Sequence, residues 1–268
     1  METARGGVAA VGVWGSLGGD KMALYRSDAL VLRTYKLGEA DQIIVFLTED
    51  YGKVRAVARR SRSAKRQTAS YYQPMTLLHA ILFGRSSQNL HRINSVDVIQ
   101  PFRALREDFT LMRCGLYMTE LLDAATRDRE PVAELFALLR QGLEQLTETS
   151  TPDTLLRLFE LQLLMLIGYT PQLFACVRCA KDVVEYETAF SPGMGGLVCR
   201  SCMTDKQRTV TLSTETLAYL RQGVMSGAES VPLLPDDAEV CQEIETVLHQ
   251  HLIARLGRDL KSYAFLHL

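Results

Sequence analysis

The chain has 268 residues, of which 47% are apolar and 23% are charged, a composition typical of folded globular proteins rather than disordered ones. The length allows one large domain or two to three small ones, and the formal net charge of −1 points to no class of partner. The longest strongly apolar run, residues 161–169, is far shorter than the roughly 20 residues that cross a bilayer, which argues against an integral membrane protein.

The first 21 residues are rich in glycine and lack a regular apolar pattern. Arg5 and the mildly apolar residues after it are weakly similar to a secretory signal, but glycines interrupt the apolar stretch. A regular strand pattern begins only at Met22. We therefore expect residues 1–21 to be a disordered leader or a mis-called start. We also expect a cytoplasmic protein whose cysteines are reduced or metal-bound.

Charge is distributed unevenly along the chain. Residues 22–102 carry 12 basic and 6 acidic side chains, a net charge of +6, whereas residues 103–268 carry 16 basic and 23 acidic ones, a net charge of −7. A basic module followed by an acidic one predicts that the first module faces a polyanion. A basic surface that contacts only solvent explains the count equally well.

The basic module contains five short apolar segments, several of which alternate with polar residues as half-buried strands do. The expected strands are residues 28–34, 42–48, 53–59, 75–83 and 88–99. The Glu49–Gly52 stretch predicts a hairpin turn between the second and third strands. Five strands in so short a segment predict a five-stranded Greek-key β-barrel of the OB type over residues 22–102.

After Pro101 the apolar period becomes helical, which predicts an α-helical domain over residues 103–268. Thr151 is expected to cap a helix that starts at Pro152 and ends at Gly168. This helix is apolar nearly all round, so we expect it at the centre of a bundle. The other expected helices cover residues 105–121, 132–143, 213–225 and 236–256.

Two C-x-x-C knuckles form the most specific motif: Cys176 with Cys179 and, 19 residues later, Cys199 with Cys202. This spacing predicts a four-thiolate structural zinc site, with one zinc per chain in a ribbon inserted at residues 174–204. Two disulfides are disfavoured without a convincing export signal, and a redox C-x-x-C is expected singly in an α/β context. A ribbon that keeps its fold without metal stays open as an alternative. Four thiolates would leave no coordination position for catalysis.

A cation-dense loop without acidic residues follows the third strand and is the best candidate for a nucleic-acid contact. Arginine can fork onto phosphate oxygens and stack on bases, which suits single or double strands. The loop and its strand supply Arg55, Arg59, Arg60, Arg62, Lys65 and Arg66, and Lys36, Lys53, Arg85 and Arg92 could extend the patch. Tyr71 and Tyr72 could stack on bases, although buried or rim tyrosines are commoner in barrels.

Residues that could carry catalysis are not evident, because the sequence contains no phosphate-binding glycine motif and no credible nucleophile–base set. We therefore do not expect an enzyme. His249 and His251 are expected at a helix surface, and His79 and His91 lie in strands without an evident carboxylate partner. The remaining thiols, Cys114 and Cys241, fall in apolar helical patterns and are expected in the core.

Several stretches together resemble the RecO family of bacterial recombination mediators. They are Ala29–Arg33 with Gly38–Asp41, Phe46–Lys53, Ala56–Arg60, Gly168–Pro171, Phe190–Pro192 with Gly195 and Gly196, both cysteine pairs, and Leu260–Ser262. The resemblance covers nearly everything from Met22 onward. It implies an α+β multidomain fold, in which an OB barrel is followed by a helical domain with a zinc-finger-like insertion, and it implies no catalytic activity.

The resemblance also implies partners. Members of the family bind single- and double-stranded DNA, anneal complementary strands, contact the tail of the single-strand-binding protein and, with the RecR protein, help load the RecA recombinase. Arg33 then joins the expected DNA-contacting residues, and the expected location is the bacterial cytoplasm at the nucleoid. Family members usually begin near the position of Met22, so the leader departs from the pattern. The alternative function is a zinc-stabilised protein-interaction adaptor without direct DNA binding.

Overall fold

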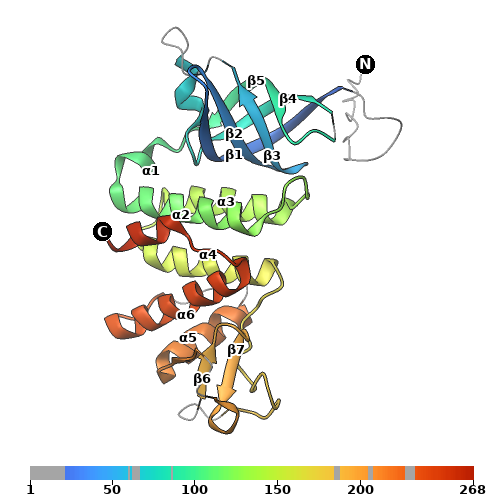
Figure 1. Ribbon diagram of the computed structural model, residues 1–268. Coiled ribbons are helices and arrows are strands. Elements are labelled where there is room, and N and C mark those ends of the chain that lie inside the picture. Colours follow the sequence, from blue (N-terminus) through green and yellow to red (C-terminus); the bar gives the residue numbers. More distant parts are fainter. Residues whose placement is uncertain are drawn as a thin grey trace, which may run out of the picture. The chain divides into compact units, whose positions relative to one another are not determined.

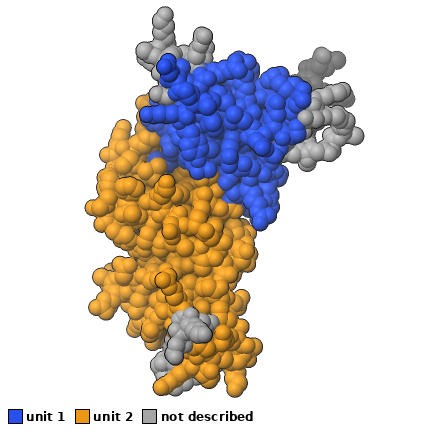
Figure 2. Space-filling model, in the orientation of Figure 1, with its two compact units in different colours: residues 1–101, 126–136 blue, residues 102–125, 137–268 orange. Residues whose placement is uncertain are grey.

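Two compact units make up the computed structural model of the chain (Figure 2). The structure describes residues 22–59, 61, 67–85, 87–183, 188–204, 208–226 and 233–268. The first unit comprises the chain up to Pro101 together with Thr126–Phe136. The second comprises Phe102–Ala125 and Ala137–Leu268. In the described part of the chain, no helix is both long and apolar enough to span a membrane.

The first unit is a closed five-stranded barrel (Figure 1). Its strands are β1 (Ala23–Leu37), β2 (Asp41–Thr48), β3 (Gly52–Ala58), β4 (Leu77–Gly84) and β5 (His91–Gln100). They close in the order β1-β2-β3-β5-β4, and β3 pairs with β5 in parallel while all other neighbours are antiparallel. The OB-type barrel predicted from the sequence is confirmed.

Small, aliphatic and aromatic side chains fill the interior of the barrel. Ile44 and Phe46 of β2 point into this core, opposite Ala56 and Val54 of β3. A β-bulge in β1 shifts the register between Val31 and Arg33. Beyond the bulge, Arg33 stands opposite Val45, which faces away from the barrel interior between the inward-facing Ile44 and Phe46, so Arg33 projects from the outer face of the barrel.

The hairpin turn before β3 forms at Glu49–Gly52, as predicted, with Gly52 at a positive φ of 66°. A Cβ at Gly52 would lie 1.9 Å from the backbone oxygen of Glu130, so only glycine fits there. Residues 126–136 reach the barrel at this point, because Arg129 donates its backbone N–H to the oxygen of Lys53 at 2.9 Å. The barrel unit therefore includes a segment that the sequence assigned to the helical domain.

The second unit is mainly helical. Its helices are α1 (Arg103–Glu107), α2 (Phe109–Ala125), α3 (Ala133–Leu146, which begins within the first unit's last residues), α4 (Pro152–Leu166), α5 (Thr214–Ser226) and α6 (Ala238–Leu256). A short 3-10 helix, η5 (Lys261–His267), follows. Leu156, Phe159 and Leu164 of α4 are buried, and α4 contacts α2, α5 and α6, which confirms its central place.

Helix ends agree in part with the sequence. Pro152 starts α4 and Gly257, at a φ of 66°, ends α6. Thr151 occupies the capping position, but its side chain makes no capping hydrogen bond. Asp237 does cap α6, since its side chain accepts hydrogen bonds from the backbone N–H groups of Glu239 and Val240.

Three expectations about histidines are wrong. His249 and His251 are buried, with 9% and 1% exposure, because the helix that carries them packs on more than one side. The Nε2 atom of His251 lies 2.8 Å from the backbone oxygen of Tyr169. His79 does have a carboxylate partner, because its Nδ1 atom lies 2.9 Å from Oδ1 of Asp28 on the neighbouring strand.

Candidate metal centre and nucleic-acid surface

The two cysteine knuckles meet in a small ribbon between α4 and α5. Its strands are β6 (Thr188–Ser191), β7 (Gly196–Cys199) and β8 (Val210–Thr211), in the order β7-β6-β8. Residues 184–187, which precede β6, lie outside the described part of the chain. Cys199 ends β7, and Cys202 ends the short 3-10 helix that follows.

Four sulfur atoms, those of Cys176, Cys179, Cys199 and Cys202, lie within 4.8 Å of one another. The Cys179 and Cys199 sulfurs are 3.8 Å apart. A tetrahedral zinc with Zn–S bonds of about 2.3 Å sets its sulfurs about 3.8 Å apart. The backbone N–H of Cys199 also points at the sulfur of Cys176, at 3.5 Å. The four side chains could therefore hold a tetrahedral metal ion, with the Cys199 N–H already donating to one of its sulfur ligands.

The four clustered thiols differ in how readily they ionise. Burial opposes ionisation of Cys176, but hydrogen bonds from the backbone of Cys199, Cys179 and Arg178 lower its pKa to about 6. Hydrogen bonding to Cys199 and Cys179 instead raises the pKa of Cys202 to about 12. Thiolates so close together repel one another, and a bound divalent cation removes that repulsion.

The ribbon is attached to α6 through the turn between β6 and β7. Arg255 donates hydrogen bonds from Nη2 to the backbone oxygens of Pro192 and Gly193, at 2.8 and 2.7 Å. Gly196 lies so close to Gln172 that a Cβ would meet the Gln172 backbone oxygen at 2.7 Å. These contacts hold the strand that delivers Cys199 in a fixed place on the helical unit.

Three of the predicted DNA-contacting residues on the barrel, Lys36, Arg55 and Arg59, are exposed, and Arg33 is half-buried. Lys53 is buried, with 6% exposure, beneath the returning segment that pairs with it. Arg60, Arg62, Lys65 and Arg66 lie outside the described residues. Accessible cations therefore flank the start of the basic loop on β1 and β3.

Two contacts bear on how this surface could bind an anion. Nη2 of Arg55 lies 3.1 Å from Oδ2 of Asp128, and both side chains are about two-fifths exposed. Such exposed pairs contribute only about 0–1 kcal/mol, so a phosphate could replace the carboxylate at little cost. Ser61 is buried and lies 3.0 Å from Oε1 of Gln42, which fixes the base of the loop beside the start of β2.

Comparisons with known proteins identify the family of the chain. Residues 22–102 match the family model described as Recombination protein O N terminal, and residues 106–264 match Recombination protein O C terminal. The chain belongs to the RecO family. It is 36% identical over 251 residues to the DNA repair protein RecO of Symbiobacterium thermophilum, which covers 91% of this chain and 97% of that protein. The DNA repair protein RecO of Anaeromyxobacter sp. strain K is 37% identical to this chain, and the match covers 88% of this chain and 93% of that protein.

These relatives are named DNA repair proteins, so the RecO chain belongs to a DNA repair and recombination family rather than to a family named for catalysis. A more distant relative, the RecO of Bacillus pumilus, is 30% identical over 91% of this chain and 94% of its own. The resemblance found in the sequence is confirmed.

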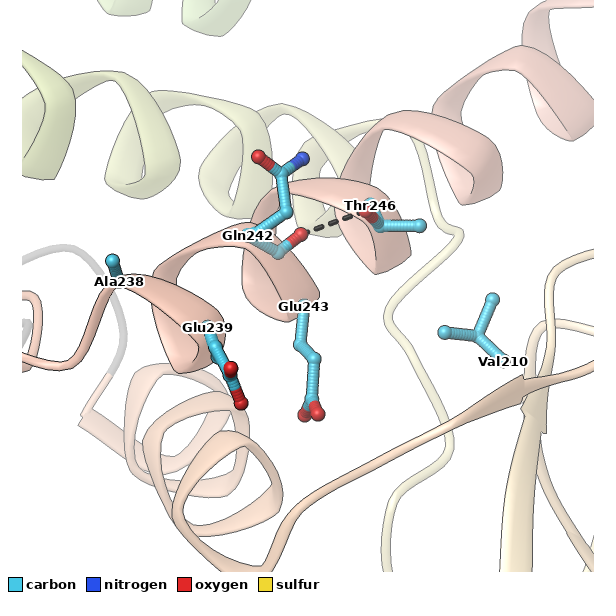
Figure 3. A pocket seen from close by; sticks show the side chains of 6 residues that line it. All are labelled: Val210, Ala238, Glu239, Gln242, Glu243 and Thr246. Atoms are coloured by element: carbon cyan, nitrogen blue, oxygen red, sulfur yellow. Dashed lines mark hydrogen bonds between the residues drawn. The ribbon is translucent and has the colours of Figure 1, made fainter.

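A surface hollow of about 360 Å³ on the helical unit lies beside the hydrogen-bonded carboxylate of Glu243 (Figure 3). It is lined by Val210, Ala238, Glu239, Gln242, Glu243 and Thr246. Oε2 of Glu243 accepts hydrogen bonds from Ser213 N at 2.8 Å and from Thr216 Oγ1 at 2.7 Å. Despite the partial burial of Glu243, these hydrogen bonds lower its pKa. The carboxylate therefore ties the start of α5 to α6, and the hollow lies beside it, between β8 and α6.

The sequence analysis did not find a charged cluster inside the helical unit of the RecO chain. Arg157 and Glu160, both on α4, are almost fully buried, and Nη1 of Arg157 lies 3.2 Å from Oε2 of Glu160. Tyr117 donates its hydroxyl to Oε1 of Glu160 at 2.7 Å. Nη1 of Arg157 also approaches Oε2 of Glu245 at 3.9 Å. These groups form a buried polar network at the centre of the bundle.

Proposed function

We propose that this protein is a recombination mediator that binds single- and double-stranded DNA and anneals complementary strands. The observation that carries the proposal is the basic edge of the barrel, where Arg55, Arg59 and Lys36 are exposed beside the cation-dense loop. An OB barrel is a common platform for nucleic acids. Annealing requires two polyanions to approach each other, and a cationic surface that does not read bases lowers that repulsion.

The partners belong to the same proposal. As a RecO family member, the chain would act with the RecR protein, contact the tail of the single-strand-binding protein and, indirectly, promote loading of RecA. Its place of action would be the bacterial cytoplasm, at the nucleoid. The chain itself would supply binding and positioning rather than catalysis.

Zinc has a structural part in this proposal. Cys176, Cys179, Cys199 and Cys202 would hold one zinc ion per chain, and the four thiolates would leave no position for a reacting water. The metal would supply rigidity to the ribbon that Arg255 ties to α6. The sulfur geometry, and not a bound ion, supports this assignment.

The test of DNA binding is a salt titration. Each phosphate contacted on a single strand contributes about −0.7 to the slope of log affinity against log salt. Changing Arg59, Arg60 and Arg62 together to Ala should make the slope shallower by about two units if all three contact phosphates. Annealing of complementary oligonucleotides should slow in parallel at low salt. Fluorescence anisotropy and a strand-annealing assay measure the two effects.

A charge-matched control removes three exposed cations from the helical unit: Arg103, Arg208 and Lys261. This triple Ala variant should keep the wild-type slope. An unchanged slope and normal annealing in the loop variant would move DNA binding to another surface. Failure of the wild-type protein to bind any oligonucleotide would favour the adaptor function.

A further inference from the structure

The pairing register of the barrel gathers one aromatic and several basic side chains in a band on its outer face. Tyr35 of β1 is opposite Ile43 of β2, which is opposite Val57 of β3, which is opposite Arg92 of β5. Resting on the DNA binding proposed above, we propose that this band is the track of unpaired DNA and that Tyr35 stacks on a base. Tyr35 would then contribute to the binding of single strands but not of duplexes.

The direction of these side chains follows from the register. Ile44 and Ala56, the neighbours of Ile43 and Val57, belong to the barrel core. Because successive residues of a strand point to opposite faces, Ile43 and Val57 project outward, and both are half-buried rather than covered. The bulge in β1 brings Tyr35 onto the same outer face.

Tyr35 is held in place without being hidden. The guanidinium of Arg33, two residues earlier on the same strand, lies over the Tyr35 ring at 5.0 Å from its centroid. Even so, Tyr35 is 43% exposed. A positioned, solvent-exposed ring next to a cation is what base stacking on a protein requires, since every base offers a π-face.

Basic side chains also line the band at its β3 and β5 end. Arg92 is exposed at its far end, and Arg55 is exposed one step along β3 from the half-buried Val57. With strands about 4.8 Å apart, the three strand steps from Tyr35 to Arg92 span about 14 Å, enough for a few nucleotides of an extended strand. Arg59 follows Ala58, the partner of Gln42, so it lies at the same end of the band as Asp41 and offers a cation there that offsets the carboxylate.

This chemistry selects an unpaired strand. In a duplex the base faces are stacked on each other, so an aromatic side chain cannot stack on them. The apolar pair Ile43 and Val57 adds no hydrogen-bond readout, so the band would bind bases without regard to sequence. Duplex DNA would instead be bound by the cations alone.

The experiment compares Tyr35→Leu with the wild-type protein on two probes, an oligo(dT) and an abasic backbone of the same length. Loss of one stacking contact should weaken oligo(dT) binding by about tenfold. Binding to the abasic probe, and to duplex DNA, should stay within twofold of wild type. Tyr35→Phe keeps the ring and should bind oligo(dT) as the wild type does.

Tyr169→Leu is a matched control, because Tyr169 is 45% exposed and lies under Arg255 at 5.4 Å, but belongs to the helical unit. It should bind both probes normally. If Tyr35→Leu weakens binding to oligo(dT) and to the abasic probe equally, or weakens binding to neither, then Tyr35 does not stack on a base. In that case the proposal that the protein binds DNA is unaffected. If the wild-type protein binds neither probe, the proposed function fails as well. Unchanged thermal melting of Tyr35→Leu shows that the barrel is folded.

Discussion

Arg157→Ala should destabilise the helical unit by about 3–5 kcal/mol at alkaline pH, because it leaves the carboxylate of Glu160 buried without its cation. The two charged groups are 3.2 Å apart but not aligned for a hydrogen bond, so the arginine acts mainly through its charge. Urea unfolding followed by far-ultraviolet circular dichroism, which reports on the helices, measures the change.

The destabilisation should depend on pH in a definite direction. Burial raises the pKa of Glu160 to about 7, although Arg157 and the hydroxyl of Tyr117 act to lower it. A raised pKa in the folded state contributes stability below the unfolded pKa, and this contribution is lost as the pH rises through about 7. Removing Arg157 raises the pKa of Glu160 further. The loss of stability in Arg157→Ala should therefore be smallest near the ordinary carboxyl pKa and largest above the folded one.

Two further variants make this prediction sharp. Arg140→Ala removes an arginine from an exposed pair with Glu144, at 3.0 Å on α3, and should change the free energy of unfolding by about 0.5 kcal/mol or less. Glu160→Gln keeps an acceptor for Tyr117 and should flatten the pH dependence. A loss below 1 kcal/mol at every pH in Arg157→Ala would show that the buried pair does not stabilise the fold.

Purified protein should contain close to one zinc per chain, and replacing Cys176 and Cys179 together by Ser should remove it. Structural zinc contributes roughly 10–16 kcal/mol of apparent binding free energy in small zinc modules, so the ribbon should lose its fold with the metal. The melting temperature should fall because the strand carrying Cys199 packs against α6 through Arg255. Elemental analysis and thermal melting give the two values.

Cys241→Ala provides the control for zinc. Its thiol donates to the backbone oxygen of Pro235 at 3.1 Å and lies outside the cysteine cluster. This variant should keep its full zinc content. Protein expressed in the cytosol and purified without chelator that holds no zinc would overturn the assignment, and the ribbon would then keep its shape through its backbone contacts alone.

Local patterns in the sequence were enough for the barrel and the cysteine cluster. The apolar run of β2, the partial alternation in β3 and the Glu49–Gly52 turn between them indicate the pairing of those strands, and each C-x-x-C knuckle brings its own two sulfurs together. Turn chemistry and ligand spacing act over a few residues, which is why they can be read from a sequence.

The features that the sequence did not reveal depend on distant contacts. Arg157 and Glu160 lie three residues apart on α4, and such a pair is usually a solvent-exposed strip on a helix. Burial of His249 and His251 depends on elements that pack on α6 from other parts of the chain. Lys53 is buried for the same reason, since the segment that covers it is 75 positions away at Asp128.

That returning segment has a consequence for the order of folding. During synthesis the five strands emerge before residues 126–136, so for a time the edge beside Gly52 and Lys53 lacks the backbone partners at Arg129 and Glu130. A polypeptide released at residue 102, where the N-terminal family match ends, would carry every strand and still keep this edge open to other chains. The N-terminal family match and the compact barrel unit therefore end at different residues, and a barrel fragment that keeps these backbone contacts has to include residues 126–136.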